Sequence, residues 1–291
     1  MLYLALVSVL WAFSFGLIGS TLSGLDSSLV ATLRLACASL LFIPFLKSKK
    51  ITKIDRLKLF ICGFIQFGLM YVSYIRAFHY LPSHLVAVFS ILTPLYVVFI
   101  YDLLNRSLSP RYLLAAFLSV LGAASIQIDG IPKKDIWIGF GLMQISGICF
   151  AFGQVYYRGW KLRNSRVRDR EVYGLLALGG TICAVGSCVY SREWNIQEIS
   201  PEQWQAIAYL GFVATGMGFF LWNKGAALCN AGTLAVFNNA VVPMAVLCSL
   251  FVFGEIKNSS SKEMIQLFIG TCLIVLALST VRKKTINQKA H

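Results

Sequence analysis

Amide side chains and a lysine interrupt one of the most apolar parts of the chain. The segment WNKGAALCNAGTLAVFNNAVVP, residues 222–243, contains one lysine and four asparagines. A buried amide needs hydrogen-bond partners, which a neighbouring helix or a ligand can supply. Asn238 and Asn239 would point about 100° apart on a helix, and one neighbouring helix would rarely satisfy both. The pair is therefore a candidate for binding a carboxylate or an amine, and interhelical hydrogen bonding remains the alternative.

Four more polar side chains lie in similarly apolar surroundings. Arg34 lies five residues into an apolar run, where a cation is costly to bury and usually has a purpose. It either anchors the structure or contacts a substrate. Gln66 and Gln154 are uncharged amides near the middle of their runs, and Ser90 follows the same Ala-Val-Phe triplet that precedes Asn238. We expect these side chains to contact the substrate.

Aromatic and cationic side chains complete the set of candidate residues. Trp11, Tyr74 and Trp222 can line a cavity for apolar or aromatic substrates, as can Phe15, Tyr71 and Tyr157, although many aromatic residues must instead face lipid or pack between helices. Arg76 and Lys224 lie near opposite ends of their runs, where they would mark the two mouths of one pathway. The alternative is that both side chains extend towards the lipid headgroups.

Enzymatic and metal-dependent chemistry finds no support in the residue pattern. The sequence contains no Walker motif, nucleophile elbow or HExxH motif. The eight cysteines all fall inside apolar runs and form no CxxC, which is typical of buried small apolar residues. We therefore expect neither a metal nor a cofactor. No Asp or Glu lies near the middle of an apolar run, so the sequence shows no obvious proton carrier within a membrane.

The composition indicates that the elements carrying these residues are membrane-spanning helices. Hydrophobic residues make up 57% of the chain and charged residues 13%, against roughly 25% charged in soluble domains. About 20 apolar residues span a bilayer as a helix. Ten such runs are Leu2–Leu22, Leu29–Leu46, Leu57–Arg76, His84–Leu103, Tyr112–Ile128, Ile136–Tyr157, Val172–Ser191, Trp204–Lys224, Ala231–Val252 and Met264–Val281. We expect an all-α integral membrane protein with ten transmembrane helices.

The distribution of basic residues predicts the topology. The formal net charge is +14, and 18 of the lysines and arginines lie in the tail or in linkers that ten spans place on one side of the membrane, against 5 on the other. Such an excess marks the cytoplasmic side. We therefore expect both termini in the cytoplasm, most simply at a bacterial inner membrane. The basic linkers can also touch anionic lipid headgroups, and topology explains the charge without nucleic-acid binding.

An internal repeat divides the chain into two halves, residues 1–130 and 131–291. Residues 74–94 and 222–243 align through Ala87-Val88-Phe89 and Ala235-Val236-Phe237, and both segments end in proline. Each half contains five spans, so the second half enters the membrane from the side opposite to the first. Two inverted repeats of this kind are the architecture of many secondary transporters, with the substrate site at their interface.

Several short motifs resemble one transporter family. Trp11-Ala12-Phe13-Ser14-Phe15 resembles the signature in the first helix of EamA-type members of the drug/metabolite transporter superfamily. Other similar motifs are Ala31-Thr32-Leu33-Arg34-Leu35, Leu92-Thr93-Pro94, Val241-Val242-Pro243 and Phe253-Gly254-Glu255. Asn105-Arg106 departs from the Gly-Glu that the family pattern places there, which puts only the role of that linker in doubt. The resemblance implies transport of small metabolites, often amino-acid efflux, and does not fix the substrate.

These observations predict a secondary transporter that alternates between two membrane faces. Its expected substrates are small zwitterionic or amphiphilic metabolites, amino acids above all. A larger nucleoside-type metabolite such as S-adenosylmethionine is the alternative within the same class, because many aromatic rings could stack an adenine. An enzyme acting on lipid headgroups is the alternative of another class, and the absence of clustered His, Asp or Glu residues disfavours it. The sequence predicts no particular oligomeric state.

Overall fold

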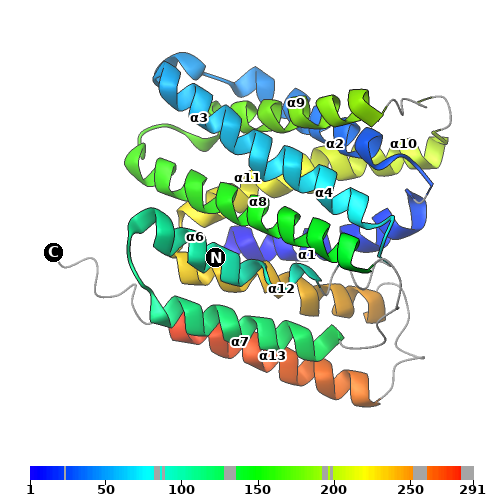
Figure 1. Ribbon diagram of the computed structural model, residues 1–291, viewed down its shortest axis with the longest axis vertical. Helices are drawn as coiled ribbons and strands as arrows, with labels where there is room; N and C mark the ends of the chain where they lie inside the picture. The colour runs from blue at the N-terminus through cyan, green and yellow to red at the C-terminus, as the bar shows by residue number, and fades with distance from the viewer. Residues whose placement is uncertain are drawn as a thin grey trace.

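Helices account for every regular element that the computed structural model describes (Figure 1). The described residues are 1–22, 24–81, 86, 89–127, 136–191, 196, 199–251 and 261–282. The α-helices are α1 (Leu2–Thr21), α2 (Ser27–Phe42), α3 (Lys53–Gly63), α4 (Met70–Ala77), α6 (Thr93–Asn105), α7 (Pro110–Gln127), α8 (Ile136–Arg163), α9 (Tyr173–Ser191), α10 (Pro201–Ala208), α11 (Gly218–Ala227), α12 (Ala231–Phe251) and α13 (Ser261–Arg282).

Two of the spans are built from three pieces each. A π-helical segment, Phe64–Leu69, joins α3 to α4 without a break, and a second one, Tyr209–Met217, joins α10 to α11. They lie in the third and eighth spans of the chain. A π-helical turn leaves backbone carbonyls without their usual partners and is frequent at functional sites.

The helices coincide with the apolar runs of the sequence. Each run overlaps one described span, although residues 84, 85, 87, 88, 128 and 252 of these runs lie outside the described residues. Five spans are long and apolar enough to cross a bilayer by length and composition, namely Ser27–Phe45, Lys53–Ala77, Ile136–Arg163, Tyr173–Ser191 and Pro201–Ala227. Four shorter apolar helices accompany them. The prediction of an all-α integral membrane protein is confirmed.

The polar ends of the helices follow ordinary capping rules. The Asp26 carboxylate accepts a hydrogen bond from the Leu29 amide at 2.8 Å at the start of α2. Thr52 caps α3 in the same way, and Ser200 and Gln203 form a capping box at α10. Each side chain satisfies backbone N–H groups that a helix start leaves unpaired. The caps thus mark where the chain leaves the apolar region.

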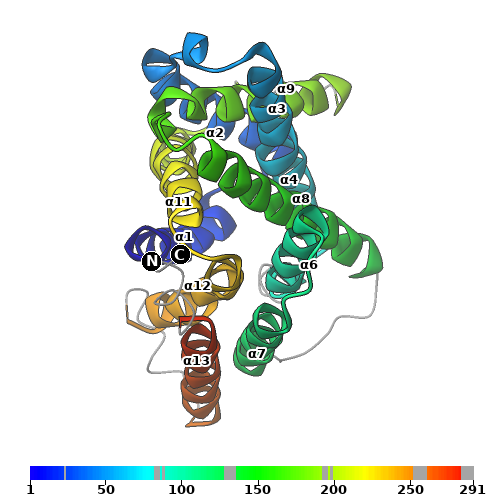
Figure 2. The ribbon, with the colours of Figure 1, turned by 90° about the vertical axis from the view of Figure 1, so that its left-hand side faces the viewer.

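Three groups of helices follow one another along the long axis of the molecule. Helices α2, α3 and α9 lie at one end, whereas α7 and α13 lie side by side at the other (Figures 1 and 2). Between them lie α1, α4, α6, α8, α11 and α12, which carry most of the predicted site residues, whereas Arg34 lies on α2 and Gln66 in the first π-helical segment. Glycines allow close contact at the first end, where Gly63 of α3 faces the Leu176 backbone of α9 and Gly179 of α9 faces the Phe60 backbone of α3.

The basic linkers lie together on one side of the helix bundle, at the ends of the helices that they connect. The connections from α6 to α7 and from α8 to α9 both lie at the left in Figure 1. The linker before α3 reaches the same end, because Lys50 Nζ and Glu171 Oε1 are 2.8 Å apart and the Lys47 amide donates to the Glu171 carbonyl at 2.9 Å. Arg158 Nε also donates to the Cys229 carbonyl at 2.8 Å, beside the start of α12.

This contact between linkers predicts a pH-dependent stability. The hydrogen bond from Lys50 holds the pKa of the Glu171 carboxyl below its ordinary range. A lowered pKa in the folded state stabilises the protein at neutral pH, and that contribution is lost as the pH falls through the folded pKa. We expect the Tm of the wild type to exceed that of Glu171→Gln at neutral pH, with a difference that begins to shrink near about pH 4, the ordinary range of a Glu carboxyl, and is lost below the lowered folded pKa. A difference in Tm that stayed constant on acidification would contradict a role for the carboxylate charge.

Candidate functional site

A cavity of about 140 Å³ lies among the central helices. It is lined by Trp11, Ser14, Arg34, Met70, Tyr71, Tyr74, Ser90, Thr93, Met143, Ser146, Gly147, Phe150, Phe219, Asn238 and Val241. Helices α1, α2, α4, α6, α8, α11 and α12 all contribute to this lining. The structure therefore brings together six of the candidate residues, namely Trp11, Arg34, Tyr71, Tyr74, Ser90 and Asn238.

Arg34 forms one end of the cavity. Its side chain is 3% exposed, Nε donates to Thr215 Oγ1 at 3.2 Å, and Nη2 donates to the Tyr71 hydroxyl at 2.8 Å. The guanidinium carbon also lies 4.9 Å from the centre of the Tyr71 ring. Neither ion pair found in the described part of the chain involves Arg34, and its Nη1 has no hydrogen-bond partner there.

The surroundings of Arg34 are chemically suited to an anion. Burying a cation is costly unless a counter-charge or hydrogen bonds compensate it. Thr215 and Tyr71 are neutral, so they orient the guanidinium without cancelling its charge. A carboxylate in the cavity would supply the opposite charge. The charge of Arg34 thus favours an anionic ligand.

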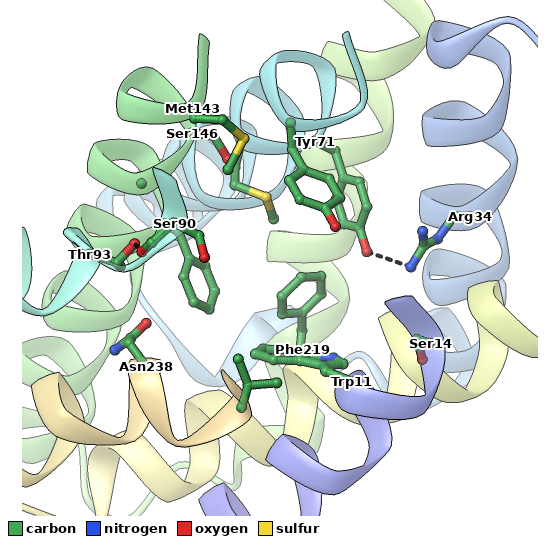
Figure 3. Close-up of a pocket in the computed structure, with 15 residues that line it drawn as sticks. Trp11, Ser14, Arg34, Tyr71, Ser90, Thr93, Met143, Ser146, Phe219 and Asn238 are labelled. Carbon is green, nitrogen blue, oxygen red and sulfur yellow. Dashed lines mark hydrogen bonds between the residues drawn. The ribbon is translucent and has the colours of Figure 1, made fainter. Parts of the chain in front are cut away.

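Hydroxyl and amide groups form the opposite end of the cavity. Ser90, Thr93, Ser146 and Asn238 lie across the cavity from Arg34 (Figure 3). The Thr93 hydroxyl donates to the Ser90 carbonyl at 2.7 Å. Asn238 is half-buried on α12 and is hydrogen-bonded to the Gln154 side chain behind it. This end is therefore polar and uncharged.

Aromatic rings line the cavity between its two polar ends. The ring of Trp11 lies 5.0 Å from Phe219 and 5.9 Å from Phe150, measured between centroids, in edge-to-face contact. Phe219 also contacts Tyr71, at 5.7 Å. Trp11 is fixed by its Nε1, which donates to the Ala214 carbonyl at 2.9 Å in the second π-helical segment. These rings offer an apolar surface for a flat or aliphatic group.

Two pairs of amides include predicted residues that lie outside the cavity lining. Gln66 and Asn223 bond each other reciprocally, with Nε2 to Oδ1 at 2.8 Å and Nδ2 to Oε1 at 3.3 Å, and both are buried. Gln154 is fully buried, accepts from Trp222 Nε1 at 2.9 Å and pairs with Asn238. Trp222 stacks on Trp11, with ring centroids 4.9 Å apart. Gln66, Gln154 and Trp222 therefore do not line the cavity, although we predicted that they contact the substrate.

The other predicted residues also lie away from the cavity. Asn239 donates to the Ile91 carbonyl at 2.9 Å and to the Ser119 carbonyl at 3.1 Å, which is the interhelical role left open from the sequence. Arg76 is exposed in the last turn of α4. Lys224 lies over the Tyr3 ring, with Nζ 4.7 Å from its centroid. These contacts provide structural roles for Asn239 and Lys224.

Several lining residues were not among the predicted site residues. Thr93, Ser146 and Phe219 line the cavity, whereas the sequence analysis gave them no role in a site. Serine and threonine are common in membrane helices because they can bond their own backbone. Their types therefore carry little signal. The one available pointer was the position of Thr93 beside Pro94, in a motif used only for the resemblance.

Comparisons with known proteins agree on the kind of protein. The family description "EamA-like transporter family" matches residues 1–128 and 136–282. The biotin transporter of Salmonella typhimurium is 34% identical over 297 residues, covering 100% of this chain and 95% of that protein. The probable biotin transporter of Pseudomonas aeruginosa is 35% identical, covering 96% of each chain, and the biotin transporter of Escherichia coli K12 is 33% identical. One solved crystal structure, 18% identical, covers 96% of each chain with a TM-score of 0.75, a likeness in fold.

Proposed function

The chain belongs to the EamA-like transporter family, and from this premise we propose that it carries biotin across the bacterial inner membrane. Transport by a bacterial membrane protein follows from the family and the helical architecture. Biotin as the substrate is supported by relatives at 33–35% identity that are named as biotin or probable biotin transporters. The main structural support for biotin is Arg34, which is buried without a counter-charge at one end of the cavity. The cavity is apolar in the middle and polar at its other end.

The chemistry of biotin matches this division of the cavity. Biotin has a carboxylate at the end of an aliphatic chain, a thioether ring in the middle and a ureido ring at the far end. The carboxylate would lie at Arg34, the chain and thioether ring against Trp11 and Phe219, and the ureido ring among Ser90, Thr93 and Asn238. Each part of the molecule then meets the kind of surface that offsets its loss of water.

The same division disfavours the substrates expected from the sequence. An amino acid carries its carboxylate and ammonium on one carbon, whereas the cavity places its cation and its amide at opposite ends (Figure 3). S-adenosylmethionine carries a sulfonium cation, which the buried charge of Arg34 would repel. Biotin is a monoanion with its polar groups far apart, and the named relatives favour it over both alternatives.

Alternating access is the mechanism that the architecture supports. We propose that residues 1–130 and 131–291 form the two inverted halves and that the cavity lies where they meet. The π-helical segments of the third and eighth spans lie next to the cavity and would absorb the bending between the two states. The excess of basic linkers at one end of the bundle supports cytoplasmic termini.

Counterflow in liposomes tests the proposed substrate whichever direction net transport takes. Purified protein is reconstituted into vesicles loaded with unlabelled biotin, and labelled biotin is added outside. We expect transient accumulation of label that protein-free vesicles do not show. Parallel vesicles loaded with leucine or S-adenosylmethionine, each tested with its own label, should show none. Accumulation of either of those compounds without biotin would overturn the assignment.

A further inference from the structure

We propose that Gln154 holds the Asn238 amide with its oxygen towards the cavity, so that this end of the site accepts hydrogen bonds from N–H groups of the substrate. The inference rests on the proposed function, and it specifies which part of biotin is recognised there. Asn238 would contact the ureido ring directly. Gln154 would act as a positioning residue, because it is fully buried and does not line the cavity.

The orientations of the Gln154 and Asn238 amides follow from two neighbouring groups, one of which can only donate a hydrogen bond and the other only accept one. The Trp222 indole N–H can only donate, so the Gln154 atom that meets it at 2.9 Å must be Oε1. The Leu234 carbonyl can only accept, so the Asn238 atom that meets it at 2.9 Å must be Nδ2. Turning either amide over would set donor against donor or acceptor against acceptor. The orientation therefore follows from chemistry as well as from the coordinates.

The amide pair leaves the Asn238 oxygen able to accept another hydrogen bond. Gln154 Nε2 donates to Asn238 Oδ1 at 3.2 Å, while Asn238 Nδ2 donates to Gln154 Oε1 at 3.3 Å. An amide oxygen has two lone pairs, and Gln154 uses one of them. Figure 3 shows this oxygen directed towards Ser90 and Thr93, with the amide nitrogen on the far side.

Thr93 presents a second acceptor at the same end. Its single hydroxyl hydrogen is used in the 2.7 Å bond to the Ser90 carbonyl, so only lone pairs remain for a ligand. Arg34 at the opposite end can only donate. The site therefore selects a molecule with an anionic acceptor at one end and N–H donors at the other, and the ureido ring of biotin carries two such N–H groups.

Analogues that lack one donor test the inference without adding bulk. Two cyclic carbamates, each with one ureido N–H of biotin replaced by oxygen, compete with labelled biotin in the counterflow assay. We expect the wild type to bind biotin about 2- to 12-fold more tightly than at least one carbamate, the range for one neutral hydrogen bond. In Gln154→Ala this ratio should fall, because the Asn238 amide then keeps only the bond to the Leu234 carbonyl and loses the Gln154 donor that holds its oxygen in place.

Gln66→Ala is the matched control. It removes an equally buried glutamine from the other amide pair, which lies outside the cavity lining. We expect it to lower the Tm and to leave the biotin-to-carbamate ratio at the wild-type value. An unchanged ratio in Gln154→Ala would overturn the positioning role, and equal binding of biotin and both carbamates by the wild type would overturn the acceptor site. Absence of any biotin counterflow would overturn the proposed function instead.

Discussion

Arg34→Ala should lower the apparent affinity for biotin by about 10- to 150-fold, the range that corresponds to losing one hydrogen bond to a charged group. The variant removes the charged side chain of the described cavity lining and leaves a bound carboxylate without its counter-ion. It also removes a partner from Tyr71 and from Thr215, which remain bonded to each other at 3.1 Å. Competition by unlabelled biotin in the counterflow assay measures this affinity.

Two further variants separate the charge from the geometry of the guanidinium. Arg34→Lys keeps the charge, but its single nitrogen must serve Tyr71, Thr215 and the carboxylate together, so we expect an intermediate loss of affinity. Arg76→Ala removes an exposed arginine outside the cavity lining and should leave affinity near that of the wild type. Wild-type affinity in Arg34→Ala, with the protein folded and inserted, would exclude this residue from the site.

Gly179→Ala should strongly destabilise the folded structure, because α9 packs directly against the backbone of α3 at this position. An added methyl group would overlap the Phe60 carbonyl oxygen and lie 2.9 Å from the Phe64 amide nitrogen. Both obstacles are backbone atoms, so α3 and α9 would have to move apart. Overpacking costs about 1–3 kcal/mol, occasionally more, and close packing is a main attraction between helices in a bilayer. We expect a lower Tm and a lower yield of monodisperse protein in detergent.

Gly186→Ala provides the comparison on the same helix. Nothing lies within 4 Å of the position that its new methyl group would occupy. Alanine is also the better helix former by about 1 kcal/mol, so the Tm should stay at or slightly above the wild-type value. Similar losses of Tm in both variants would show that the effect comes from the loss of glycine and not from the contact between α3 and α9.

Most of the fold could be predicted from the sequence because each span is a continuous apolar run. The boundaries were less predictable. Helix α8 continues to Arg163, beyond the predicted end at Tyr157, and α3 begins at Lys53, before the predicted start at Leu57. Polar residues can extend a helix into the headgroup region, so apolarity marks where the membrane ends and not where the helix ends. The family resemblance, drawn from five short motifs, is confirmed.

The site was most predictable where a residue type was unusual for its surroundings, whereas Ser90 was found through its position after the repeated Ala-Val-Phe triplet. Arg34 stood out as a cation in an apolar run, and the structure places it in the cavity wall. The adjacent amides Asn238 and Asn239 gave the same signal, yet only Asn238 lines the cavity, because Asn239 meets the backbone of Ile91 and Ser119. Sequence adjacency cannot show which side of a helix faces a neighbour, and that depends on packing between distant spans.

The reciprocal hydrogen bonds between Gln66 and Asn223 fix how the third and eighth spans are aligned along their length. Sliding one span along the other by a single helical turn, about 5.4 Å, would separate both amides from their partners. A bilayer interior offers no water to replace those bonds, so misaligned pairings are disfavoured even where apolar surfaces would fit equally well. The same constraint would hold in a domain-swapped dimer. If two molecules exchanged their first halves, Gln66 of one molecule would have to meet Asn223 of the other, and the third and eighth spans would keep the same alignment.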